Sequence, residues 1–189
     1  MQTNWVVLTG APSAGKTTVV QALAELGYST QTEVARGYIS EQLALGRSLQ
    51  EICDDRPGLQ EILFQRSLNI EGNLDPHHPH ILDRSMIDTV GYCLFYGIPI
   101  EPFVRRIPPQ RYRIVLLFDP LPFQPDAVRV EDAEMALRAG LYMERAYRDV
   151  GYSPIRVPIM SVPERTDFVL DHLKRLEPSS VRLSSMAAA

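Results

Sequence analysis

A run of eight residues near the amino terminus has the composition and spacing of a phosphate-binding loop. Gly10-Ala11-Pro12-Ser13-Ala14-Gly15-Lys16-Thr17 has a glycine, four free positions and then Gly-Lys-Thr, which is the P-loop pattern. The glycines let the backbone wrap around a phosphate chain, so that successive N–H groups and the positive end of the next helix face the anion. Lys16 adds a positive charge for the β and γ phosphates, and the Thr17 hydroxyl is placed to bind Mg²⁺. We therefore predict that ATP or GTP binds with Mg²⁺ on residues 10 to 17 and Thr18.

A carboxylate is expected to face this loop. Asp83 ends the short apolar run HILD at 80 to 83, and ligands in an α/β sheet gather outside the carboxyl ends of the strands. A carboxylate there can hold Mg²⁺ directly or through water, or accept a proton from an attacking hydroxyl. The alternative is that Asp83 only caps the helix that begins near Ser85.

Three further charged residues follow strand ends and are candidates for the acceptor side of the site. Glu33 comes after the second predicted strand, and Arg36 lies one turn later. Glu33 can deprotonate a substrate hydroxyl while Arg36 holds a phosphate, or the two can form an ordinary surface salt bridge. Arg84 is a candidate phosphate contact, and its alternative is a structural ion pair.

Arg129 lies between the strand that ends at Asp119 and the long helix predicted from Val130. A loop of Pro, Phe, Gln and Asp surrounds it, and such a loop can close over bound phosphates as a lid. We therefore predict a catalytic contact from Arg129. Arg138 and Arg145 fall on the long helix itself and are expected on its solvated face.

The elements that position these residues alternate between strand and helix. We predict strands at 5–10, 28–34, 80–85, 113–120 and 155–160, with helices at 17–27, 35–45, 58–74, 86–97, 130–151 and 162–176. This alternation is typical of an α/β fold of the P-loop NTPase type, with about five parallel strands covered by helices on both faces. Pro158 in the last strand indicates an edge position or a strand end.

Two segments carry more specific expectations. In the helix at 58–74, we expect Leu59, Ile62, Leu63 and Ile70 on one apolar face. The segment 98–112, rich in proline and arginine, is expected to be a connection on the surface. We predict a single domain at 1–177 and a disordered tail at 178–189, because the tail has no periodic apolar face.

Composition limits the classes of function. The chain has 189 residues, 45% hydrophobic residues and a formal net charge of −4, with no apolar run long enough to cross a bilayer. A general nucleic-acid binder usually carries a basic face, so any phosphate binding is expected to be local. Two cysteines far apart indicate neither a disulfide framework nor a zinc site. The start of the chain lacks the features of a secretory signal, and we expect a cytoplasmic protein.

Several segments together resemble a known family. The stretches GAPSAGKTT at 10–18, TEVARGYI at 32–39 and LDRSMIDT at 82–89 are similar to small P-loop kinases, as is the stretch from VRVEDAE through GYSPIRVP to SVPER at 161–165. Within that group they resemble AAA-type ATP-binding domains like the nicotinamide riboside kinase domain. The resemblance implies a kinase-type parallel sheet, an acceptor site bordered by Glu33 and Arg36, and a lid that contains Arg129.

The same resemblance implies that Asp83 and Arg84 belong to an Asp-Arg-Ser motif of nucleoside kinases, and that the loop 161–165 passes near the nucleotide base. The chain departs from those kinases in having Glu33-Val34 where they have a Glu-Pro pair after the second strand. The general base therefore stays open between Glu33 and Asp83.

Our leading hypothesis is a Mg²⁺-dependent phosphotransferase that moves the γ-phosphoryl group of ATP to a hydroxyl of a small, nucleoside-like molecule. The alternative is a regulatory P-loop ATPase or GTPase switch that acts through a protein partner. A kinase needs a concave acceptor site walled by the helix after the second strand and the segment 86–97, whereas a switch needs an exposed apolar patch.

Overall fold

The computed structural model describes residues 2–109, 111–122 and 133–175. Within these residues the strands are β1 Val6–Gly10, β2 Thr30–Gln31, β3 Ile81–Asp83, β4 Ile114–Phe118 and β5 Ile155–Val157. The helices are α1 Lys16–Glu25, α2 Val34–Ala44, α3 Leu49–Cys53, α4 Arg56–Gly72, α5 Met86–Tyr96, α6 Glu101–Val104, α7 Ala133–Asp149 and α8 Val162–Lys174. The predicted tail at 178–189 lies outside the described residues, and the single domain at 1–177 stays a prediction.

The five strands form one parallel sheet in the order β2-β3-β1-β4-β5. β1 lies at the centre, paired with β3 through Val6 and Ile81 and with β4 through Val6 and Ile114. β5, which ends just before Pro158, lies at an edge, where a residue without an N–H costs no ladder hydrogen bond. The structure confirms the predicted α/β class and the parallel five-stranded sheet.

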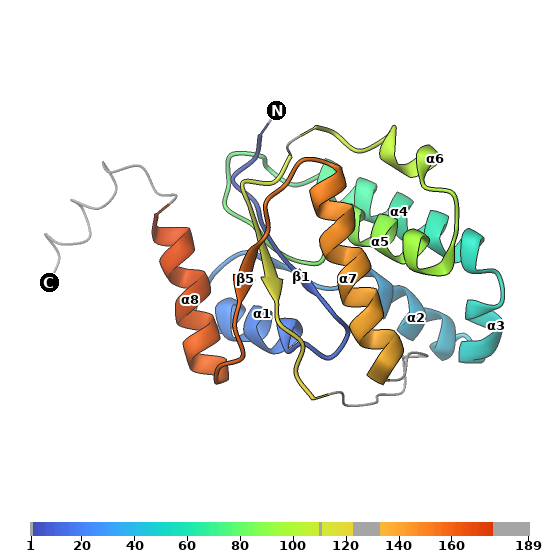
Figure 1. Ribbon diagram of the computed structural model, residues 1–189, viewed down its shortest axis with the longest axis horizontal. Coiled ribbons are helices and arrows are strands. Elements are labelled where there is room, and N and C mark those ends of the chain that lie inside the picture. Colours follow the sequence, from blue (N-terminus) through green and yellow to red (C-terminus); the bar gives the residue numbers. More distant parts are fainter. Residues whose placement is uncertain (1, 110, 123–132, 176–189) are drawn as a thin grey trace, which may run out of the picture.

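Helices cover both faces of the sheet (Figure 1), and the side chains of β1 alternate between them. Val6 and Leu8 pack in a core cluster with residues of α1 and α8. Trp5 and Val7 pack in a second cluster with residues of α4, α5 and α7. Because β1 is buried on both faces, its continuous apolar run in the sequence is the pattern expected for a central parallel strand.

α2, α3 and α4 pack together at one end of the molecule around a smaller apolar cluster of Tyr38, Ile52, Leu59 and Leu63. The predicted apolar face of α4 is only half right. Leu59 and Leu63 are buried, but Ile62 and Ile70 are 41% and 37% exposed. Phe64 is buried in their place, and three polar residues of α4 also turn inward: Gln60, Ser67 and Glu71.

The predicted boundaries differ most where an element is short. β2 has two residues instead of the seven expected over 28–34, and the chain enters α2 directly from Glu33. The connection 98–112 contains α6, and it is not wholly on the surface. Phe103 of α6 is buried with its ring centroid 5.2 Å from that of Phe64, and Tyr112 is 1% exposed. The connection therefore contributes Phe103 and Tyr112 to the core cluster that also contains residues of α4 and α5.

The sheet directs the functional loops to a single crevice. The loop after β1 leads into α1 on one face of the sheet, and the loop after β3 leads into α5 on the other (Figure 1). β1 and β3 are hydrogen-bonded neighbours, so their two loops diverge at adjacent strand ends and leave a gap between them. The P-loop and Asp83 are therefore brought to the same crevice.

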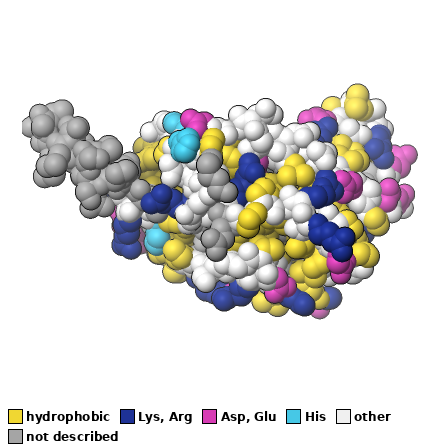
Figure 2. Space-filling view, turned by 90° about the horizontal axis from the view of Figure 1, so that it is seen from above, with side chains coloured by type: hydrophobic (Ala, Val, Ile, Leu, Met, Phe, Trp, Pro, Cys, Tyr) yellow, Lys and Arg dark blue, Asp and Glu magenta, His cyan; other side chains and the backbone are white. Residues whose placement is uncertain are grey.

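None of the described helices is long and apolar enough to span a membrane. Figure 2 views the molecule from above relative to Figure 1, and on this face dark blue Lys and Arg side chains lie beside magenta Asp and Glu side chains. The mixture agrees with a chain whose basic and acidic residues nearly balance.

Close packing of α5 on α7 predicts that Gly91→Ala is destabilising. A β-carbon on Gly91 would lie 2.5 Å from Met143 Sδ and 3.0 Å from Met143 Cα, so α7 would have to move. We expect a loss of about 1–3 kcal/mol in the free energy of unfolding, measured by urea denaturation.

Gly37→Ala is the matched control, since it makes the same change within α2 at a position with nothing within 4 Å of the added carbon. This change is expected to be neutral or stabilising by about 0.5–1 kcal/mol. Equal stability of the Gly91→Ala variant and the unaltered protein would contradict the packing described for α5 and α7.

Candidate active site

The loop between β1 and α1 turns through backbone conformations that favour glycine. Gly10 and Gly15 have φ values of 129° and 79°, and Ser13 also lies in the left-handed region at 61°. Gly15 is the N-cap of α1. Because it has no side chain, it provides no side-chain acceptor for the first N–H groups of the helix. An anion placed there would meet these N–H groups and the positive end of the helix.

Arg165, in the first turn of α8, contacts the backbone of the P-loop. Its side chain is 1% exposed, and Nη1 donates to the carbonyl oxygen of Ala14 at 2.6 Å. Nε and Nη2 donate to the carbonyl oxygens of Pro158 and Asp119 at 3.0 and 3.3 Å. Because the C=O and N–H of a trans peptide point in opposite directions, this contact turns the Gly15 N–H away from Arg165. Arg165 is therefore a positioning residue for the loop.

Lys16 folds back along the loop that precedes it. Its Nζ donates to the carbonyl oxygens of Ala11 at 2.7 Å and Gly10 at 3.2 Å, and the side chain is buried. Burial, followed by the charge of Arg84, lowers the pKa of Lys16 to about 7. An anion that binds beside Lys16 would stabilise the protonated, positively charged amine and raise its pKa toward the ordinary value.

Thr17 and Asp83 meet across the crevice. The Thr17 hydroxyl donates to Asp83 Oδ2 at 2.7 Å, although the residues are 66 positions apart in the sequence. The other oxygen, Asp83 Oδ1, is buried and has no hydrogen-bond partner within the described part of the chain. Burial and the nearby charge of Glu33 raise the pKa of Asp83. A hydroxyl and a carboxylate with a spare oxygen are a donor set that suits Mg²⁺.

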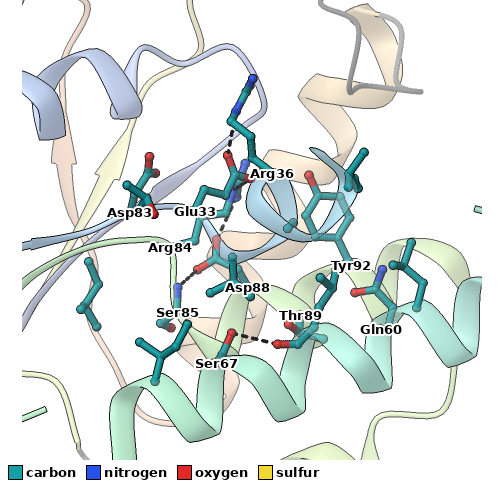
Figure 3. Close-up of a pocket in the computed structure, with 18 of the residues that line it drawn as sticks. Glu33, Arg36, Gln60, Ser67, Asp83, Arg84, Ser85, Asp88, Thr89 and Tyr92 are labelled. Atoms are coloured by element: carbon teal, nitrogen blue, oxygen red, sulfur yellow. Dashed lines mark hydrogen bonds and ion pairs between the residues drawn. The ribbon is translucent and has the colours of Figure 1, made fainter. Parts of the chain in front are cut away.

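Arg84 lies between two carboxylates (Figure 3). Its Nε donates to Glu33 Oε1 and its Nη1 to Asp88 Oδ1, both at 2.9 Å. Nη1 also reaches the Gly10 carbonyl at 3.1 Å. Burial opposes ionisation of Glu33, but the charges of Arg84, Lys16 and Arg36 outweigh it and hold the pKa of Glu33 below its ordinary value. Glu33 is therefore ionised at neutral pH, and Asp83 is the harder of the two to ionise.

Asp88 anchors this ion pair, and the sequence interpretation missed it. Its Oδ1 also accepts from the Thr9 hydroxyl at 2.6 Å, and its Oδ2 accepts from the Tyr147 hydroxyl at 2.6 Å and the Ser85 N–H at 3.0 Å. Asp88 thus ties together β1, α5 and α7. The spacing Ser85-x-x-Asp88 is a capping-box signal from which the residue could have been found.

A pocket opens beside the P-loop, between α2, α4 and α5 (Figure 3). It encloses about 1170 Å³ of empty space, counting the part open to solvent, which is large enough for a nucleoside-sized molecule. Its end near the P-loop is lined by Pro12, Glu33, Asp83, Arg84 and Asp88. Further from the loop the lining is mainly aromatic, apolar or amide in character: Ile39, Cys53, Leu59, Gln60, Leu63, Tyr92 and Tyr96.

The structure thus brings most of the predicted site residues together. Lys16, Thr17, Asp83 and Glu33 lie around one crevice, and Arg36 lines the pocket with its Nε 3.9 Å from Glu33 Oε2. For Arg84 the arrangement found is the ion pair, and its contact with a phosphate stays a prediction. Arg129 lies outside the described residues.

Arg138 and Arg145 are exposed on α7, as expected. Gln60, Glu71 and Arg165 were not predicted as site residues either, because nothing in the local sequence marks a polar side chain that a distant segment will cover. Among the described residues, no cluster of three His, Cys, Asp or Glu side chains could hold a metal ion.

The sequence matches the model of one protein family, described as AAA domain, over residues 5–165. No curated protein shows significant similarity to the chain. The family match covers the P-loop, the pocket and Arg165, and it agrees with the resemblance noted from the sequence.

Solved structures of kinases share the fold. Deoxyadenosine kinase from M. mycoides, with dCMP and dCDP bound, aligns with a TM-score of 0.65 at 13% identity over 92% of this chain and 100% of that one. The NadR protein in complex with NAD and AMP-PNP aligns with a TM-score of 0.63 at 22% identity, over 90% of this chain and 49% of NadR. Thymidylate kinase from Ehrlichia chaffeensis gives a TM-score of 0.56 at 16% identity, over 89% and 97%. At these identities the likeness concerns the fold.

Removing Arg165 is expected to weaken triphosphate binding. Arg165→Met leaves the Ala14 carbonyl without its donor and frees the Ala14–Gly15 peptide to rotate, so we expect the Kd for Mg·ATP to rise about 10- to 100-fold. Titration calorimetry measures this at a temperature at which circular dichroism shows the variant folded. Arg145→Met, which removes an exposed arginine that pairs with Asp149 within α7, is the control. An unchanged Kd in the folded Arg165 variant would show that the contact does not position the loop.

The depressed pKa of Lys16 predicts a specific dependence of stability on pH. The unfolded chain holds the Lys16 proton up to about pH 10.5, whereas the folded chain releases it near pH 7. Between these values the unfolded state binds more protons, so the free energy of unfolding rises with pH. Relative to Lys16→Met, which does not titrate, the unaltered protein should gain about 3 kcal/mol from pH 7 to pH 10. Urea denaturation across this range measures the difference, and a difference that stays constant with pH would contradict the depressed pKa.

Proposed function

The chain belongs to the AAA domain family, and from that premise we propose that it is a Mg²⁺-dependent phosphotransferase that moves the γ-phosphoryl group of ATP to a hydroxyl of a small, nucleoside-like molecule. The observation that carries the proposal is a pocket that opens directly beside the P-loop and has an ionised carboxylate at its near end. A transfer reaction needs this juxtaposition of donor and acceptor sites, since the two substrates must react in line.

Mg²⁺ would be held by the Thr17 hydroxyl and by Asp83, directly or through water. Asp83 Oδ1 supports this assignment, because it is buried without a donor among the residues that the structure describes, and such a carboxylate oxygen is costly unless a cation reaches it. When bound, the metal ion neutralises charge on the β and γ phosphates. Lys16 adds a second positive charge to the same phosphates, and the amides of residues 13 to 18 hold them in place.

The opposite pKa shifts of the two carboxylates support a division of roles. Glu33 stays ionised beside Arg84 and faces the pocket, so it is placed to accept the proton of the attacking hydroxyl. Asp83 is bound to Thr17 on the P-loop side and belongs with the metal ion. Of the two candidates that the sequence leaves open, we therefore assign the general base to Glu33.

The ion pairs at the near end of the pocket favour a hydroxyl acceptor over a phosphorylated one. Arg84 already donates to Glu33 and Asp88, and its 8% exposed side chain leaves little room for another partner. A phosphate here would be placed close to three carboxylates: Glu33, Asp83 and Asp88. A neutral hydroxyl avoids this repulsion.

The nucleoside-like character of the acceptor rests on the rest of the pocket. Its outer part has aromatic and apolar walls, which suit a planar ring attached to the hydroxyl-bearing group. Arg129 would complete the site from the lid, where its positive charge would meet the transferring phosphoryl group. We also expect the protein to act in the cytoplasm.

The alternative of a regulatory switch makes a different prediction for ATP consumption. A kinase should consume ATP faster when a suitable nucleoside is present, whereas a switch should be indifferent to nucleosides, sugars and short alcohols. We expect at least one nucleoside to stimulate Mg²⁺-dependent ATP consumption with stoichiometric formation of its monophosphate. The measurement is a panel of these compounds with ADP and phosphorylated product detected together.

Two variants sharpen this experiment. Glu33→Gln should lower kcat by about 10²- to 10⁴-fold, since it removes the proton acceptor, and Asp83→Asn should lower turnover and raise the Mg²⁺ concentration required. Glu41→Gln is the control. It makes the same chemical change on α2, the helix that begins directly after Glu33, but Glu41 pairs with Arg66 on the surface. Slow ATP hydrolysis that no compound stimulates would favour the switch and end the kinase proposal.

A further inference from the structure

A buried tyrosine on α7 contacts the ion pairs of the active site. Tyr147 is fully buried, and its hydroxyl donates to Asp88 Oδ2 at 2.6 Å. The hydroxyl oxygen also lies 2.7 Å from Ser85 Oγ. Burial and the charge of Asp88 raise the pKa of Tyr147 well above its ordinary value, so the hydroxyl keeps its proton and remains a donor. Tyr147 lies outside the described lining of the pocket, and any effect on the site must pass through the residues that it contacts.

The Asp88 carboxylate accepts two hydrogen bonds on each oxygen. Oδ2 accepts from the Tyr147 hydroxyl and the Ser85 N–H. Oδ1 accepts from the Thr9 hydroxyl and from Arg84 Nη1. The terminal torsion of an aspartate side chain is soft, so the donors decide how the carboxylate is turned. By holding Oδ2, Tyr147 and Ser85 leave Oδ1 directed at Arg84.

Arg84 has a backbone conformation that side chains disfavour. Its φ is 69°, in the left-handed region, and among the described non-glycine residues only Ser13 also has a positive φ. Such a conformation persists where the surrounding structure enforces it, and it is typical of functional sites. The Arg84 N–H donates to the Leu8 carbonyl at 2.9 Å, and the guanidinium is held by the Gly10 carbonyl and by Asp88. Asp88 therefore helps to keep Arg84 in place.

Glu33 depends on Arg84 for its direction. It is the N-cap of α2, yet its side chain makes no cap hydrogen bond to that helix. Arg84 Nε donates to Glu33 Oε1 at 2.9 Å, whereas Arg36 Nε is 3.9 Å from Glu33 Oε2. Figure 3 shows Arg84 between Glu33 and Asp88. A turn of the Asp88 carboxylate would therefore release Arg84, and the direction of Glu33 would change with it.

We infer that Tyr147 is a positioning residue for Glu33: its hydroxyl holds Asp88, and through Asp88 it holds Arg84 in the orientation that directs Glu33 into the pocket. The inference rests on the proposed function for the role of Glu33 as general base. The arrangement of the side chains does not, because it forms without ATP or acceptor. Since Tyr147 is buried outside the pocket, its loss should slow the chemical step and leave acceptor binding largely unchanged.

The side-chain N–H signal of Arg84 tests the arrangement without turnover. In ¹⁵N-labelled protein this signal is assigned by its loss in Arg84→Lys. It should exchange slowly with water, because the Nε–H is buried and bonded to Glu33. Tyr147→Phe removes one oxygen atom and keeps the ring. We expect the exchange rate of the Arg84 Nε–H to rise about tenfold or more in this variant.

Tyr152→Phe is the matched control. The Tyr152 hydroxyl accepts from the Tyr112 N–H at 2.9 Å, and its ring centroid lies 6.0 Å from that of Tyr147. This variant loses a hydrogen bond in the same part of the core but leaves all donors to Asp88 in place. Its Arg84 signal should exchange as in the unaltered protein, whereas a purely structural role for Tyr147 predicts similar changes in both variants.

Turnover with an acceptor identified in the panel of compounds provides a second readout. Tyr147→Phe should lower kcat about tenfold, with the KM for the acceptor changed less than about twofold. If Tyr147 acts through Asp88, the two changes are not additive. The double variant Tyr147→Phe/Asp88→Ala should then have the same kcat as Asp88→Ala alone.

The outcomes separate this inference from the proposed function. An Arg84 exchange rate unchanged by Tyr147→Phe, an equal change in Tyr152→Phe, or an unchanged kcat would each overturn the positioning role. If Tyr147→Phe does not fold, the unaltered protein decides: an Arg84 Nε–H that exchanges as fast as that of exposed Arg145 would overturn it, and slow exchange would support it. If the exchange rate responds and no acceptor is phosphorylated, Tyr147 still positions Glu33 and the phosphotransferase proposal fails.

Discussion

The carbonyl oxygen of Phe118 lies 2.6 Å from the place that a β-carbon on Gly10 would occupy, so only bare backbone fits at the end of β1. The loop that follows is confined on two more sides. α7 approaches so closely that a β-carbon on Gly140 would lie 3.0 Å from Ala11 Cβ, and Arg165 holds the Ala14 carbonyl. A loop fixed this tightly presents its N–H groups without paying an ordering cost when an anion binds.

Ion pairs connect several of the buried charges around this loop. Arg84 is shared between Glu33 and Asp88, and Asp88 in turn accepts hydrogen bonds from β1, α5 and α7. Buried ion pairs contribute little net stability, because desolvation offsets the attraction. Here the pairs fix the direction of Glu33 into the pocket, while Asp83 Oδ1 lacks a hydrogen-bond donor among the described residues. An unpaired carboxylate oxygen at the crevice therefore supports a cation site there.

The sequence predicts those features whose signals are local. β1 and β4 are continuous apolar runs, the P-loop is contiguous, and Asp83 is the last residue of β3, so the sheet, the crevice and the approach of Thr17 to Asp83 could all be anticipated. Arg165 and Asp88 act through contacts with segments far along the chain. From the sequence, Arg165 is an arginine near the start of a helix and Asp88 is a capping residue. Neither position indicates which distant residue the side chain will contact.

α4 illustrates why the pocket was harder to predict than the fold. A periodicity argument assigns apolar residues to the buried face, and it selected Ile62 and Ile70, which are exposed. The face that turns inward carries Gln60, Ser67 and Glu71 beside Leu63 and Phe64, because part of it borders the pocket and not the core. The short helices α3 and α6 were not predicted and β2 was predicted too long for a related reason, since such short elements depend on neighbours more than on propensity.

The central claim is that the backbone amides of residues 13 to 18 form the binding site for a nucleoside triphosphate. Titration of ¹⁵N-labelled protein with Mg²⁺ and AMP-PNP, followed by amide NMR shifts, tests this residue by residue. We expect the largest shifts on these amides, with Gly15, Lys16 and Thr17 foremost. Saturable binding that leaves these amides unshifted, or the absence of binding, would contradict it.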